Sequence, residues 1–238
     1  MQDLNGLMGV IYGASEWFLK MAIVNFMWFL MSLPLFTAFL VIDISNAAGI
    51  VLFGALVLLF APLLFFPATA AVFASARDWL LGTDSSTVKM YFAHLGANYK
   101  ESVKMGVPFA AVWLFWYLAY FYLESGSGAI NWLFLITGLA LFVYTVNFLS
   151  ISVHYRMSGK DRLLNAFFVS AGSPLLSLII VAGSGLLIWI TAVKLLLLLP
   201  LLTASLSVFL SFSAFYSFTL RVKNKREAKA TGGDGALL

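Results

Sequence analysis

Long apolar stretches dominate this sequence and leave few folds open to it. A helix needs about 20 apolar residues to cross the hydrocarbon core of a bilayer. Six stretches of roughly this length follow one another along the chain, at residues 21–42, 48–73, 105–123, 130–153, 173–193 and 196–220. The last two form one apolar run that Lys194 interrupts, and the run is too long for a single span. The pattern predicts an all-α protein, a polytopic membrane bundle of six transmembrane helices.

The scarcity of charge supports the same class. Charged residues make up 10% of the chain, whereas a soluble domain carries about 25% to keep its surface wetted. A water-facing globular protein is therefore excluded, and the lipid bilayer is the expected surrounding. We expect no cleavable signal peptide, because Asp3 and Glu16 occupy the region where such a peptide is basic.

The basic residues predict the orientation of the bundle. With the N-terminus inside, the inner segments hold 13 of the 14 Lys and Arg residues, and only Lys194 lies outside. The positive-inside rule therefore predicts three outward-pointing hairpins in the plasma membrane, with the N-terminus and the C-terminus both cytoplasmic.

Two longer inner linkers join the hairpins, at residues 74–104 and 154–172. Each holds an arginine, a small polar turn and a short amphipathic run, at residues 88–99 and 163–170. We predict short cytoplasmic interfacial helices at these runs. The chain divides into a six-helix transmembrane domain, residues 1–222, and a polar tail, residues 223–238, whose composition predicts a disordered cytoplasmic segment.

The sequence offers no catalytic constellation. It has no cysteine, no phosphate-binding glycine loop and no Gly-x-Ser-x-Gly elbow. His94 and His154 lack nearby partners that would complete a metal site. No ionisable residue falls at the centre of a span, which disfavours ion-coupled transport. We therefore expect no enzyme activity, no cofactor, no metal and no nucleic-acid partner.

One aromatic stripe is a candidate for contact with a solute. Trp113, Trp116, Tyr117 and Tyr120 follow the i, i+3, i+4, i+7 spacing of a single helix face, and Glu124 comes next at the outer end. Flat rings beside a carboxylate suit a sugar, which stacks its C–H faces on the rings. The alternative, which we favour, is an aromatic belt combined with helix packing.

Polar side chains inside the spans are candidates for joining helices. Thr203, Ser207 and Ser211 recur at four-residue spacing, which suits either close helix packing or a polar pathway, and we favour packing. Asn25 and Asn147 each need a hydrogen-bond partner away from lipid. We predict that both amides connect neighbouring helices.

Three segments resemble a known family. They are the start from Gly6 to Tyr12, the block from Pro67 to Phe73 followed by Arg77-Asp-Trp79, and the segment from Tyr91 to Ser102. In this order they resemble the YesL-like family, bacterial membrane proteins built on a domain of unknown function. The Arg77-Asp78 pair departs from the more basic sequence expected there.

The resemblance implies a role near carbohydrate uptake, because genes of this family often lie beside those of sugar ABC importers. It implies an accessory or regulatory protein, with an ABC importer or sensor subunit as partner. It carries over no site residues. The alternative function is a self-contained transporter or channel for a small neutral solute, which the hairpin repeat and the aromatic and hydroxyl stripes suggest.

Overall fold

The fold is a bundle of helices, seen here in a computed structural model that describes residues 2–83, 87–123 and 128–233. In this part of the chain there is no strand, and six helical stretches are long and apolar enough to cross a membrane. They run over Ile11–Val41, Ala47–Leu80, Thr87–Leu123, Gly128–His154, Pro174–Val193 and Leu199–Lys225. The predicted all-α architecture with six spans is confirmed.

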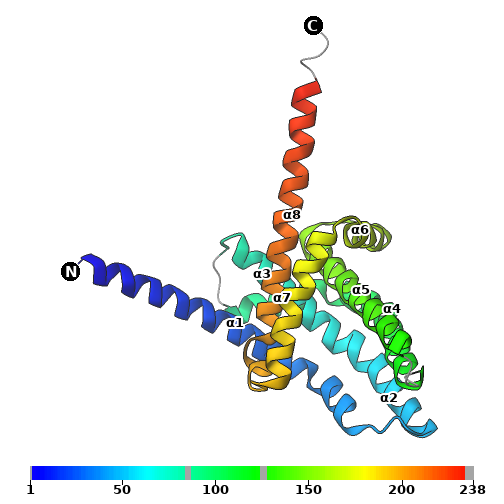
Figure 1. Cartoon of the computed structure of the whole chain (residues 1–238). Helices are drawn as coiled ribbons and strands as arrows, with labels where there is room; N and C mark the ends of the chain where they lie inside the picture. The colour runs from blue at the N-terminus through cyan, green and yellow to red at the C-terminus, as the bar shows by residue number, and fades with distance from the viewer. Residues whose placement is uncertain (1, 84–86, 124–127, 234–238) are drawn as a thin grey trace.

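The elements follow one another with short connections (Figure 1). In chain order they are α1 (Gln2–Val41), α2 (Ala47–Phe60), η1 (Ala61–Phe65), α3 (Phe66–Leu80), α4 (Thr87–Leu123), α5 (Gly128–His154), α6 (Gly159–Gly172), α7 (Pro174–Val193), η2 (Leu199–Thr203) and α8 (Ala204–Gly233). The turn at Lys194 separates α7 from η2, so the predicted division of the last apolar run is confirmed.

The second and sixth spans each contain one π-helical turn, η1 and η2. Each turn holds a proline, Pro62 in η1 and Pro200 in η2. A proline lacks the N–H that the α-helical ladder needs, so the backbone around it relaxes into a wider turn. The carbonyl and N–H groups that this change releases must find partners elsewhere in the bundle.

One of the two predicted interfacial helices is not separate. Residues 88–99 are the first turns of α4, which continues unbroken to Leu123. Tyr91 is completely buried there and lies beside the carbonyl oxygen of Ala68 in α3, 3.4 Å from its hydroxyl. The segment therefore packs one face against the bundle, while Val88, Phe92 and Tyr99 on its other side are exposed. The other predicted interfacial helix is α6, whose N-cap Ser158 accepts the Asp161 N–H.

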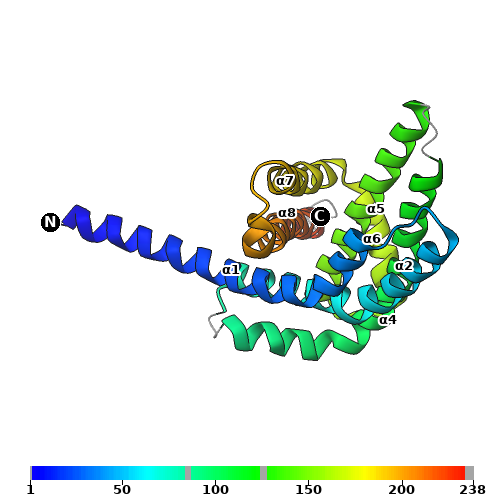
Figure 2. The same cartoon turned by 90° about the horizontal axis from the view of Figure 1, so that it is seen from below.

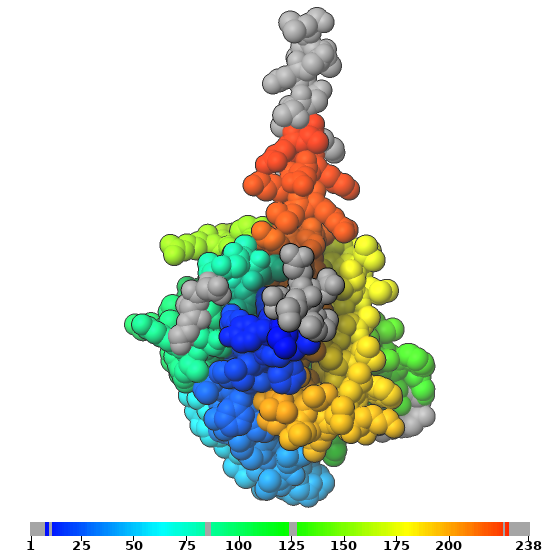
Figure 3. Space-filling model, turned by 90° about the vertical axis from the view of Figure 1, so that its left-hand side faces the viewer, coloured from blue at the N-terminus to red at the C-terminus, as the bar shows by residue number. Residues whose placement is uncertain are grey.

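Both terminal helices are longer than the spans they contain. α1 begins at Gln2, and its first turns project from the bundle (Figures 1 and 2). α8 continues to Gly233, where a disordered segment was predicted from residue 223, and Figure 3 shows it extending well beyond the body. Residues 234–238 of the predicted tail lie outside the described residues, and a domain boundary at residue 222 stays a prediction.

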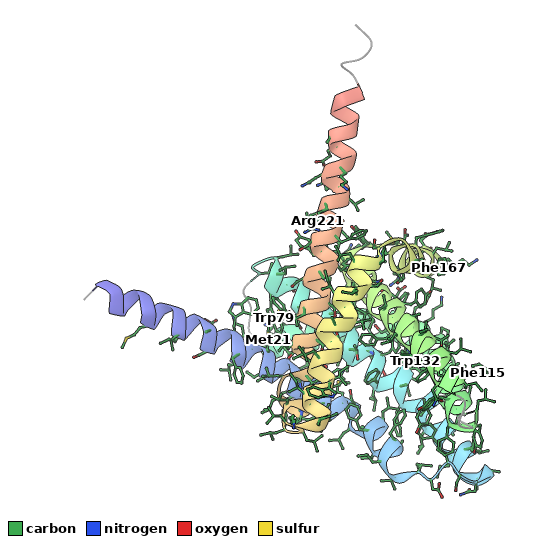
Figure 4. The ribbon with its side chains drawn as sticks, in the orientation of Figure 1. Met21, Trp79, Phe115, Trp132, Phe167 and Arg221 are labelled. Carbon is green, nitrogen blue, oxygen red and sulfur yellow. The ribbon has the colours of Figure 1, made fainter. Side chains whose placement is uncertain are left out.

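The core forms around α3, which is buried along almost its whole length. Its alanines let α1, α4, α5 and α8 pack closely around it, because small side chains allow helix backbones to approach. The periphery carries large exposed side chains, and Figure 4 shows Phe115, Trp132 and Phe167 pointing outward. The hydrophobic exterior is the surface that a bilayer covers.

Candidate intramembrane binding site

A cavity of about 720 Å³ lies within the bundle, and all six membrane-spanning helices contribute to its lining. One wall comes from the α7 and α8 pair, which stands beside α1 in Figure 2. The opposite wall comes from α2, α3, α4 and α5, and it is largely aromatic and aliphatic. Among the described residues that line the cavity, none is Asp, Glu, Lys, Arg or His.

The structure brings three of the five candidate solute-contact residues to this cavity. Trp113, Trp116 and Tyr117 are part of its lining. Tyr120 is not among the lining residues, and its ring is parallel to that of Trp116, with centroids 5.9 Å apart. Glu124 lies outside the described residues. The stripe therefore borders a cavity along part of its length, while the rings of Trp116 and Tyr120 stack at its outer end.

The indole N–H groups of the stripe are already bonded to α5. Trp113 Nε1 donates to Thr145 Oγ1 and Trp116 Nε1 donates to Thr137 Oγ1, each over 3.2 Å. Trp116 also covers Gly138, where an added Cβ would lie 2.5 Å from the indole ring. These contacts hold α4 against α5, which is the packing role favoured from the sequence.

The hydroxyl stripe of the sixth span also faces the cavity and pairs mainly with α7. Ser211 Oγ lies 3.1 Å from Ser184 Oγ, and Thr203 Oγ1 lies 2.7 Å from Thr191 Oγ1. Both pairs are buried, so they join the two helices of the last hairpin. Ser207 Oγ is different, because it is buried and has no hydrogen-bond partner.

Asn25 joins the first span to the last. Its side chain donates to the carbonyl of Leu199 over 2.7 Å and accepts the N–H groups of Ala204 and Ser205 over 2.8 and 2.9 Å. These backbone groups belong to the π-helical turn η2 and the start of α8. The predicted role of Asn25 in connecting helices is confirmed.

Asn147 makes the equivalent connection with fewer bonds. Its Nδ2 donates to Ser170 Oγ of α6 over 2.9 Å, while its Oδ1 is buried without a partner. The predicted connecting role is confirmed for this residue as well.

An ionic cluster lies where α3, α4 and α5 meet, and sequence analysis missed it. Arg77 Nη2 lies 2.7 Å from Asp78 Oδ1, and Arg77 Nη1 donates to the carbonyl of Val153 over 2.5 Å. The other carboxylate oxygen of Asp78 lies 2.8 Å from His94 Nε2. The Arg77-Asp78 departure from the family pattern was the available signal. It did not reveal the partner of Asp78, because His94 lies 16 residues further along the chain, on another helix.

A second ion pair fixes α6 to α4. Arg162 bonds to Glu101, and the arginine side chain is mostly buried while the carboxylate is exposed. Burial lowers the pKa of Arg162, because water no longer solvates its charge fully. Within the described ranges, no group of three His, Cys, Asp or Glu residues could hold a metal ion.

Comparison with known proteins shows what the chain is similar to. Residues 21–120 match a family described as Protein of unknown function, DUF624. The chain is also 27% identical over 218 residues to the uncharacterized protein YesL of Bacillus subtilis (strain 168), covering 89% of this chain and 92% of the relative. The chain is similar to YesL over most of its length. The resemblance inferred from the sequence is thereby confirmed. No solved structure matches.

The match to the family covers only part of the cavity of this YesL-like protein. Residues 21–120 include Asn25, the α3 core and the tryptophans of α4. The hydroxyl wall from α7 and α8 lies beyond the matched segment.

Proposed function

We propose that this YesL-like protein is an accessory or regulatory protein of carbohydrate uptake in the plasma membrane, and that it contacts an ABC-type importer through its cytoplasmic side. The family resemblance suggests the process. The observation that carries the mode of action is the projection of α1 and α8 beyond the bundle (Figure 1). The N-terminus and the C-terminus are both cytoplasmic in this proposal, as the positive-inside rule requires.

The two projecting helices have different surfaces. The projecting part of α1 exposes large apolar side chains, including Met8, Ile11 and Tyr12. The end of α8 exposes Arg221, Lys223 and Lys225 beyond the apolar part of the span. Apolar side chains next to a bilayer and cations near anionic headgroups both favour contact at the inner membrane surface. They suit an accessory subunit that lies against a membrane-embedded partner.

Co-purification tests this proposal. The intact chain and a variant with Arg221, Lys223 and Lys225 all replaced by glutamine would each be expressed with the transmembrane subunits of a sugar ABC importer and isolated in mild detergent. We expect to recover the importer subunits with the unaltered chain and to see a marked loss of recovery with the variant that lacks these three cations. Lys194→Gln, at the opposite end of the bundle, is the matched control and should leave recovery unchanged. Recovery at background level for the intact chain would overturn the proposal.

The second candidate is a transporter or channel for a small neutral solute, and one observation favours it. The aromatic stripe and the hydroxyl stripe, far apart in the sequence, line the same cavity. The absence of native cysteine allows single cysteines at Trp113, Trp116, Ser207 and Ser211, with Tyr120 as a control outside the cavity lining. A water-filled path predicts that a charged thiol reagent labels the first four positions. Failure to label any of them would remove this candidate.

A further inference from the structure

We propose that the central cavity is a binding site for the hydrocarbon chain of a membrane lipid. This inference goes beyond the proposed role in carbohydrate uptake and does not depend on it. It rests on three properties of the cavity: its size, the state of its polar groups and its place within the membrane-spanning helices.

The size of the cavity suits a ligand. A volume of about 720 Å³ lies within the range of ligand-binding pockets, roughly 300–1,000 Å³. Filled with water, it would hold on the order of twenty molecules, each needing two to four polar partners. Apolar side chains such as Phe53, Val57 and Phe65 form most of the surface and offer none.

The polar groups that reach the cavity are nearly all used within the protein. The two indole N–H groups of α4 are bonded to threonines of α5, as described above. Thr69 Oγ1 donates to the Phe65 carbonyl and accepts the N–H of Trp28. Four further hydroxyls, those of Ser184, Ser211, Thr191 and Thr203, form the two pairs between α7 and η2–α8, which leaves the hydroxyls of Ser207 and Tyr117 outside these pairs. A sugar, with a hydroxyl on almost every carbon, would therefore leave most of its hydrogen bonds unmade.

One hydroxyl of the lining is buried without a hydrogen-bond partner. Ser207 Oγ is buried, lines the cavity and has no partner in the protein. The cavity therefore offers an extended apolar surface with few free hydroxyls, which fits a lipid chain and does not fit a polyol.

The bilayer itself supplies such a ligand. The residues of the lining belong to helices that cross the membrane, and the cavity is only partly enclosed by them. Hydrocarbon chains surround these helices at very high local concentration, whereas the core of the bilayer holds no water that could fill the cavity. A lipid chain also supplies the packing contacts that an empty apolar cavity would lack.

Tryptophan quenching by lipids with brominated acyl chains tests the inference directly, because bromine quenches an indole only near contact. Trp28 lines the cavity and is 7% exposed, whereas Trp132 faces outward and is 66% exposed. Two single-tryptophan proteins would keep either Trp28 or Trp132, with the other six tryptophans replaced by phenylalanine. Each would be placed in phosphatidylglycerol and phosphatidylcholine vesicles with and without brominated chains, with circular dichroism confirming the helical fold.

If a lipid chain occupies the cavity, brominated lipid should quench the fluorescence of the Trp28 protein. The fraction quenched should be at least half of the fraction quenched in the Trp132 protein. Iodide in the aqueous phase should leave Trp28 unquenched. Filling the cavity with Ser207→Phe should abolish the effect of brominated lipid on Trp28 while preserving it on Trp132. Leu210→Phe, on an exposed position of the same helix, is the matched control and should change neither signal.

Two results would overturn the inference. Absence of quenching of Trp28 by brominated lipid, with normal quenching of Trp132, would show that no chain enters the cavity. Quenching of Trp28 by iodide would show a water-filled cavity and would favour the solute pathway instead. Both outcomes are independent of the co-purification experiment, because the vesicles contain no importer.

Discussion

Replacing Asn25 with alanine should destabilise the bundle more than any comparable change of a polar residue in a single span. Asn25 is completely buried and makes three hydrogen bonds to the backbone of η2 and α8. The alanine variant would leave one carbonyl and two N–H groups without this partner. In the interior of a membrane protein no water replaces it.

The expected loss follows from the number of bonds. A hydrogen bond inside a membrane protein contributes about 0.6 kcal/mol on average, and a typical net value in proteins reaches about 1.5 kcal/mol. Three bonds give a loss of about 2 to 4.5 kcal/mol in the free energy of unfolding. Asn147→Ala is the matched control, because Asn147 is equally buried but its side chain makes one hydrogen bond, to Ser170. Its loss should cost about 0.6 to 1.5 kcal/mol.

Reversible unfolding in mixed micelles, with increasing fractions of sodium dodecyl sulfate, measures both variants against the parent chain. The account requires the Asn25 variant to unfold at a clearly lower fraction of the denaturing detergent than the Asn147 variant. Equal losses, or a smaller loss at Asn25, would show that its bonds to η2 do not support the last span.

Two further predictions concern packing and pH. Gly106→Leu should lower the free energy of unfolding by about 1–3 kcal/mol through overpacking, because an added Cβ meets Pro62 Cα at 3.0 Å. The same change at Gly185, where an added Cβ has nothing within 4 Å, should cost much less. Equal losses of the two variants in the detergent assay would refute this reasoning. The backbone N–H and the hydroxyl of Ser45 hold the pKa of Asp43 below its ordinary value of 3.8. Its stabilising contribution is therefore complete above that value and declines as the pH falls below it. Asp43→Asn should remove this part of the acid sensitivity, and unfolding curves that keep the same pH dependence would contradict the assignment.

The spans could be predicted from sequence because hydrocarbon imposes a simple rule on length and polarity. Each of the six apolar runs is a helix, and the single cation Lys194 marks the turn between the last two. The need of Asn25 for a partner was equally predictable. Its partners were not, because the backbone groups it binds are released by a π-helical turn 174 residues away.

Other features depend on packing that the local sequence does not reveal. The segment at residues 88–99 has the pattern of an interfacial helix, and only the structure shows that it is continuous with the span that follows it in α4 and that Tyr91 is buried beside α3. The pairing of Asp78 with His94 depends on the crossing of two helices. The aromatic and hydroxyl stripes were each visible in the sequence, but only the fold places them around one cavity.

Labelling of single cysteines in intact cells tests the central claim of six spans most directly. Lys194→Cys and Lys223→Cys would be introduced separately into the chain, which has no native cysteine. A membrane-impermeant maleimide should label Lys194→Cys in intact cells and Lys223→Cys only after the membrane is permeabilised. Labelling of both positions from the same side of the membrane would contradict the account.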